Sequence, residues 1–68
     1  MKVDAKTIGH RLIELRGKRT RDEVCKSTGI KPTALANYEN GYRIPRDETK
    51  ITLCEFYKVG IEELFYHP

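Results

Sequence analysis

Hydrophobic positions near the start of the chain recur at the spacing of an α-helix. Ile8, Leu12 and Leu15 are separated by four and then three residues, so they fall on one helical face. Asp4 precedes them and can accept hydrogen bonds from the free amides at a helix start. Gly17 follows them and tolerates the left-handed conformation that closes helices. The pattern therefore predicts a first helix between Asp4 and Gly17.

A capping box predicts a second helix. In the segment "TRDE", Thr20 can accept a hydrogen bond from the amide of Glu23, and the Glu23 side chain can reach back to the amide of Thr20. Gly29 ends this helix. Its expected packing positions are Val24, Cys25 and Thr28.

The third predicted helix begins at a proline. Pro32 suits the first helical position, where an amide would have no intrahelical partner. Leu35 and Tyr38 are expected to point inward, and the turn Asn40-Gly41 stops the helix. The sequence therefore predicts a helix over 32–39.

Two further helices are predicted in the last third of the chain. One covers about Asp47 to Lys58, and a short one follows Gly60 over the segment "IEELFY", residues 61–66. The expected buried positions of the longer helix are Ile51, Leu53, Cys54 and Tyr57. Because no segment alternates hydrophobic and polar residues between turns, as strands do, the predicted fold class is all-α with five helices.

The length limits the architecture. A chain of 68 residues forms one small core, because it buries only about 60% of the surface that its unfolded form exposes. We therefore expect a single domain over residues 1–68, ordered over about 5–66, with little room for a catalytic cleft.

Charge is distributed unevenly along the chain, whose net charge is +3. Residues 11–46 hold nine basic and four acidic side chains, a net +5, whereas residues 47–68 hold two basic and five acidic ones, a net −3. This asymmetry indicates an anionic partner on one side of the molecule, and nucleic acid is the leading candidate.

Several other classes of protein are excluded. The two cysteines, Cys25 and Cys54, are too few for a disulfide scaffold and too far apart for a metal knuckle. With His10 and His67 they show no nucleophile–base or ligand spacing, so we expect no enzyme, no metal and no cofactor. No apolar run approaches the roughly 20 residues that span a bilayer, and the start of the chain lacks a hydrophobic signal region. The expected setting is the reducing cytoplasm.

The second and third predicted helices carry the features of a helix-turn-helix. Two helices crossing steeply over a short turn need a small side chain at the crossing, a glycine in the turn and a hydrophobic anchor. Cys25, Gly29 and Leu35 fill these positions. With the segments "IGHRLIELR", "TRDEVCKSTGI", "ALANYENGYRIP" and "LCEFYKVGIEEL", the chain resembles the lambda-repressor-like, Cro-type helix-turn-helix regulators, also called the xenobiotic-response-element family.

The resemblance, which runs from about Ile8 to Phe65, implies a five-helix DNA-binding domain. Its helix-turn-helix lies at about residues 21–39, and the third helix, about 32–39, enters the major groove of double-stranded DNA. Such domains bind as dimers to half-sites about one helical turn, roughly 34 Å, apart. The implied function is a sequence-specific transcriptional regulator. We expect a repressor, because so small a chain has little surface for recruiting polymerase.

The resemblance also assigns roles by position. Residues expected to read base edges are Lys31, Pro32, Thr33 and Asn37. Residues expected to contact phosphates are Lys18, Arg19, Thr20, Arg21, Asn40, Tyr42, Arg43 and Arg46. Arg16 and Glu39 are expected to form a structural ion pair between the first and third helices. Longer polar side chains are frequent in the family where Pro32, Ala34 and Ala36 stand, so DNA shape is expected to contribute to specificity.

Three alternatives stay open from the sequence. Asn37 is either a base-reading residue or a solvated helix position. The hydrophobic residues Phe56, Leu64, Phe65 and Tyr66 either fill the core or leave a surface patch, through which we expect a homodimer. The fold also serves as an antitoxin-like or protein-interaction module. No small-molecule ligand is expected, because no pocket is evident.

Overall fold

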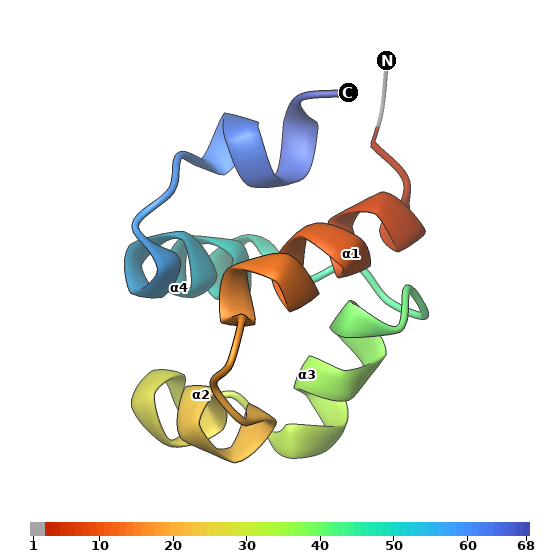
Figure 1. The fold of residues 1–68 in the computed structure, drawn as a ribbon. Coiled ribbons are helices and arrows are strands. Elements are labelled where there is room, and N and C mark those ends of the chain that lie inside the picture. Colours follow the sequence, from red (N-terminus) through yellow and green to blue (C-terminus); the bar gives the residue numbers. More distant parts are fainter. Residues whose placement is uncertain (1–2) are drawn as a thin grey trace.

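The computed structural model describes residues 3–68, which form five helices and no strand (Figure 1). The helices are α1 (Ala5–Arg16), α2 (Arg21–Thr28), α3 (Pro32–Glu39), α4 (Asp47–Tyr57) and a π-helix, η1 (Glu62–Tyr66). The predicted all-α fold with five helices is confirmed, and α3 has the predicted bounds.

Local caps fix the helix starts. The Asp4 carboxylate accepts a hydrogen bond from the amide of Thr7 at 2.8 Å. Hydrogen bonding by the Thr7 side chain, and then by this amide, lowers the pKa of Asp4. The Thr20 hydroxyl accepts from the amide of Glu23 at 3.1 Å. The Glu23 carboxylate lies 3.4 Å from the same hydroxyl instead of bonding to the Thr20 amide, so only half of the predicted capping box forms.

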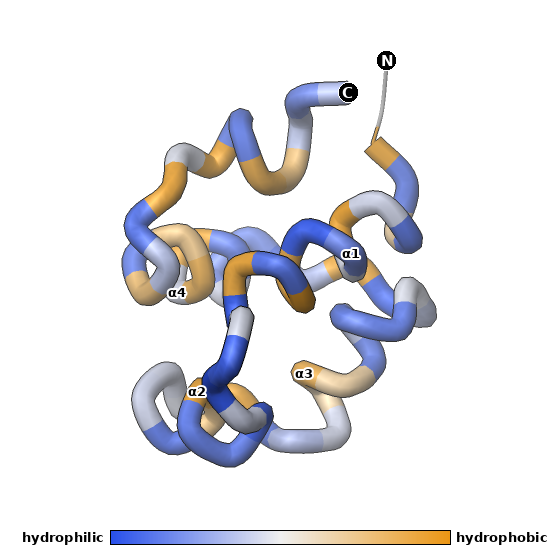
Figure 2. The backbone as a smooth tube through the Cα atoms, viewed as in Figure 1, coloured by the Kyte–Doolittle hydropathy of each residue, from blue (hydrophilic) through white to orange (hydrophobic). Residues whose placement is uncertain are grey.

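The core takes side chains from every helix. α1 packs against α3 and η1, while α2 packs against α3 and α4. Figure 2 shows hydrophobic positions recurring along each helix, whereas the connection between α1 and α2 is hydrophilic. The hydrophobic side chains at 2% exposure or less are Ile8, Leu12, Val24, Leu35, Leu53, Leu64 and Phe65.

One detail of the predicted C-terminal part was wrong, and another was not foreseen. Ile51 was expected to be buried but is 51% exposed. The buried face of α4 starts at Leu53, and Ile51 lies two residues earlier, about 200° around the helix axis. The last helix is also wider than an α-helix, because the amide of His67 donates to the carbonyl of Glu62, five residues back, at 2.6 Å.

The C-terminal hydrophobic residues divide between core and surface. Leu64 and Phe65 are buried, Phe56 is half-buried, and Tyr66 is 48% exposed. The Tyr66 hydroxyl lies 3.0 Å from the ammonium nitrogen of Lys50. Most of this group therefore fills the core, and Tyr66 contributes apolar surface.

The two ends of the described chain lie side by side. Val3 is buried and lines one small hollow together with Phe65 and Tyr66. In Figure 1 both ends lie on the side of the molecule away from α2 and α3.

α1 and α3 approach each other closely at Gly9. This residue lies in the middle of α1, and a side chain there would overlap the main-chain carbonyl oxygens of Tyr38 and Glu39 at the end of α3. The absence of a side chain at Gly9 therefore allows α1 and α3 to pack backbone against backbone.

We predict that Gly9→Ala destabilises the protein by about 2 kcal/mol, because the added methyl group forces the two helices apart. In a helix interior without this contact, the same change would stabilise by up to about 1 kcal/mol. The measurement is urea unfolding followed by circular dichroism. Gly60→Ala is the control, because a side chain at Gly60 meets no atom within 4 Å. Equal stability of the two variants would contradict the prediction.

Candidate nucleic-acid interface

The turn between α2 and α3 is held by its own residues. Gly29 has a φ of 78°, and its amide donates to the carbonyl of Cys25 at 2.8 Å. The Thr28 hydroxyl donates to the carbonyl of Val24 at 2.7 Å and accepts from the amide of Ile30 at 3.2 Å. Thr28, which the sequence marked only as a packing position, therefore bridges the end of α2 and the turn.

One face of α3 remains open to solvent. Leu35 and Tyr38 are buried against the core, as predicted. On the other side Thr33 is exposed and Asn37 is half-buried, one helical turn further along. Within residues 3–68 the Asn37 side chain has no hydrogen-bond partner, whereas its main-chain carbonyl accepts from the amides of Tyr42 and Arg43. The two other base-contact candidates, Lys31 and Pro32, are exposed.

The candidate phosphate-binding residues belong to two connections and, for Arg21, to the first position of α2. Figure 1 shows the α1–α2 connection on one side of α3 and the α3–α4 connection on the other. All of these side chains are exposed except that of Arg21, which is half-buried. The first group is Lys18, Arg19, Thr20 and Arg21, and the second is Asn40, Tyr42, Arg43 and Arg46.

Arg19 has partners inside the protein. Its guanidinium carbon lies 5.3 Å from the ring centre of Phe56 and 5.9 Å from that of Tyr57, both on α4. One of its terminal nitrogens donates to the carbonyl of Leu15 at 3.2 Å. The structure therefore directs Arg19 toward α4.

A buried carboxylate joins three helices. The Glu39 side chain, at the end of α3, has no exposed surface. It receives hydrogen bonds from Arg16 Nε at 2.9 Å and Arg16 Nη2 at 3.1 Å, and a third from Arg21 Nε at 2.7 Å. The Glu39 contact raises the pKa of Arg16, because the bond favours the charged guanidinium. The structure thus contains the ion pair expected between Arg16 and Glu39.

The participation of Arg21 was not predicted. Arg21 is the first residue of α2 and is 18 positions from Glu39 in the sequence. No helical spacing links these two positions, because their meeting depends on how α2 is packed against α3. The sequence therefore holds no local signal for the third member of the cluster.

Two buried thiols and one buried phenol remain uncharged. Burial raises the pKa of the Cys25 and Cys54 thiols and of the Tyr57 phenol, so all three favour the protonated form. Among residues 3–68, no group of three His, Cys, Asp or Glu side chains is placed to hold a metal ion. No helix in this range combines the length and apolar character needed to cross a bilayer.

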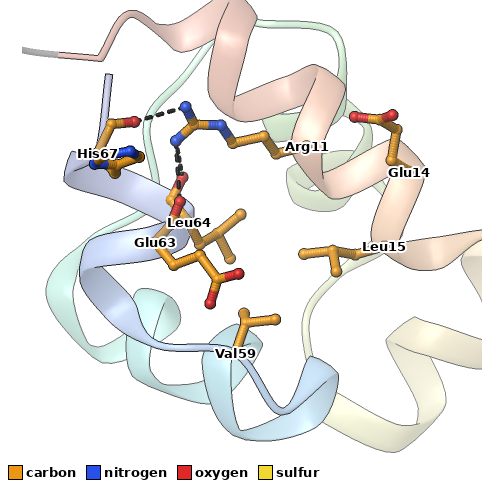
Figure 3. A pocket seen from close by; sticks show the side chains of 7 residues that line it. All are labelled: Arg11, Glu14, Leu15, Val59, Glu63, Leu64 and His67. Atoms are coloured by element: carbon orange, nitrogen blue, oxygen red, sulfur yellow. Dashed lines mark hydrogen bonds between the residues drawn. The ribbon is translucent and has the colours of Figure 1, made fainter.

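A hollow of about 430 Å³ lies between α1 and the C-terminal segment (Figure 3). Side chains of α1 and of residues 59–67 leave this space between them, and the expectation that no small molecule binds stays a prediction. Leu15, Val59 and Leu64 form its apolar lining. The Arg11 guanidinium on its rim donates to the carbonyls of residues 63, 64 and 67 at 3.1, 3.2 and 2.6 Å. Arg11 therefore ties the C-terminal segment to α1.

Comparison with known proteins identifies a family for most of the chain. A family model described as helix-turn-helix matches residues 11–64, which include all of α2, α3 and α4. A search of curated proteins found no match.

We predict that Arg16→Met destabilises the protein by about 3 kcal/mol, because Glu39 then keeps only the Arg21 bond for its buried charge. Lys18→Met is the control. Lys18 is exposed, and its substitution is expected to change stability by no more than about 0.5 kcal/mol. Thermal and urea unfolding measure both variants. Similar losses in the two would show that the buried cluster contributes nothing beyond surface charge.

Proposed function

The chain belongs to the helix-turn-helix family of DNA-binding regulators, and we propose that it is a repressor that places α3 in the major groove. The observation that carries this proposal is the open face of α3, where Thr33 is exposed and Asn37 reaches solvent without a partner in the described chain. A major groove is wide enough to admit an α-helix and presents a distinct pattern for each base pair.

The side chains on this face suit base contacts. The Asn37 amide can bind adenine through two hydrogen bonds, and Thr33 can offer a methyl group to thymine or a hydroxyl to either base type. Lys31 and Pro32 complete the proposed reading surface. Ala34 and Ala36 add no long polar groups, so part of the specificity is assigned to DNA shape.

The connections on either side of α3 are proposed to hold the DNA backbone. Their cationic side chains neutralise phosphates, and the amides at the start of α2 bind phosphate without a side chain. The proposed phosphate contacts are Lys18, Thr20, Arg21, Asn40, Tyr42, Arg43 and Arg46, with Arg19 joining them only if it leaves its site on α4.

We propose that the protein acts as a cytoplasmic homodimer built from one domain per chain. The helices share one core, which supports a single domain. Ile51, Ile61 and Tyr66 expose apolar surface on the C-terminal helices, where we place the dimer contact. Repression needs only that the dimer occupy a promoter.

Selection of bound duplexes from a randomised DNA library tests this function. We expect enrichment of a two-fold-related site whose halves lie about one helical turn apart. The alternative, an antitoxin-like or protein-interaction module, predicts no enriched sequence and no dependence of binding on salt.

We predict that Asn37→Ala relaxes the choice at one base pair of each half-site. The lost discrimination should be about 1–3 kcal/mol, the value of one bidentate contact, at an unchanged preference elsewhere. Competition between the selected duplex and its single-base variants measures this. An unaltered preference at every position would show that Asn37 does not read a base.

We predict that Arg43→Ala weakens binding to all duplexes alike. Loss of one phosphate contact should reduce the slope of log affinity against log salt by about 0.9, with no change in base preference. Lys58→Gln is the control, because it removes the same charge from the C-terminal end of α4. A change in base preference with Arg43→Ala would contradict the assignment.

A further inference from the structure

The buried ion cluster of Arg16, Arg21 and Glu39 carries one surplus positive charge. Two guanidinium groups share a single carboxylate, and no other salt bridge to either arginine exists among residues 3–68. The Glu39 side chain is fully buried, whereas the side chains of Arg16 and Arg21 are 18% and 39% exposed. The surplus positive charge is therefore solvated only through the exposed parts of the two arginines.

Arg16 is the less available of the two arginines, because each of its three guanidinium nitrogens already has a partner inside the protein. Nε and Nη2 bond to Glu39, and Nη1 donates to the main-chain carbonyl of Arg19 at 2.8 Å. Its side chain is 18% exposed. Arg16 therefore serves as the interior partner of the carboxylate.

Arg21 occupies the surface end of the cluster. It bonds to Glu39 through Nε alone, and within the described chain its two terminal nitrogens have no hydrogen-bond partner. Its side chain is 39% exposed. Arg21 is also the first residue of α2, where the free amides and the helix dipole favour an anion.

We propose that Glu39 is a positioning residue for the DNA backbone: it holds Arg21 by Nε so that the terminal nitrogens bind one phosphate beside the start of α2. This inference rests on the proposed function, because the ligand is the phosphate of bound duplex DNA. It assigns to Glu39 a role beyond its structural pair with Arg16.

The chemistry of the guanidinium explains why the position needs arginine. A guanidinium is planar and carries five N–H donors, so one edge can bond to a carboxylate while the terminal nitrogens bind a phosphate. A lysine ammonium is one nitrogen on a flexible stem. Its three donors lie on that same nitrogen, so if Glu39 holds it, no separate nitrogen is left to aim at the DNA.

The arrangement also couples backbone contact to the orientation of α3. Glu39 is the last residue of α3, so the carboxylate that fixes the position of Arg21 moves with the helix that carries Thr33 and Asn37. A phosphate bound by Arg21 therefore sets the register of α3 along the duplex, as backbone contacts do in other complexes.

Binding of the selected duplex by the full chain tests the inference, with fluorescence anisotropy measured between 50 and 200 mM salt. We expect Arg21→Lys to behave like Arg21→Ala. Each should lose roughly tenfold in affinity, as for one charge-assisted hydrogen-bonded contact, and about 0.9 in the log–log salt slope. Lys58→Gln removes the same charge from a position outside the proposed interface and should keep the wild-type slope.

A second arm tests Glu39 itself. Glu39→Gln should lower the salt slope in the wild-type background and leave it unchanged in the Arg21→Ala background, with folding verified by circular dichroism. If Glu39→Gln does not fold, the comparison of Arg21→Lys with Arg21→Ala decides alone.

The outcomes separate this inference from the proposed function. Wild-type slope and affinity in Arg21→Lys would overturn the positioning role, since a point charge would then suffice. An equal effect of Glu39→Gln with and without Arg21 would also overturn it. Failure of the wild-type chain to bind any selected duplex would overturn the proposed function, and this inference with it.

Discussion

The carboxylate of Glu39 lies inside the protein, and two arginines supply the hydrogen bonds that replace its water. A buried charge that loses its partners is strongly destabilising, so the end of α1 and the start of α2 must both meet the end of α3. Gly9 also brings α1 to the end of α3, because only a residue without a side chain lets α1 approach the α3 backbone so closely. These contacts hold α1, α2 and α3 together on the inner side of α3, so the outer face of α3 stays open.

The helix positions could be predicted because their signals are local. A carboxylate or hydroxyl at a helix start, such as Asp4 or Thr20, acts on amides three residues away, and Pro32 needs no partner at all. Burial was harder to predict. Ile51 fits a helical pattern, yet only the direction from which α2 packs on α4 decides which face of α4 is inside. The π-helical winding of η1 likewise depends on tertiary context, not on a sequence signal.

The candidate site could be predicted only in part, for the same reason. The open position of Thr33 and Asn37 follows from the burial of Leu35 and Tyr38 on one helix, which periodicity supplies. The family resemblance supplied the Arg16–Glu39 pair. The bond from Arg21 to Glu39 joins residues on different helices and could be seen only in the assembled fold.

The adjacency of Val3 to Phe65 and Tyr66 has a practical consequence for engineering. Neighbouring termini are what circular permutation requires, so a short peptide could join them without stretching the fold. The two ends of the described chain lie on the side away from α2 and α3 (Figure 1), so a fluorescent label or a dimerising tag attached there would be remote from α3. Artificial dimers could therefore be assembled through the two ends with α3 of both copies left open, and linker length would set the distance between the copies.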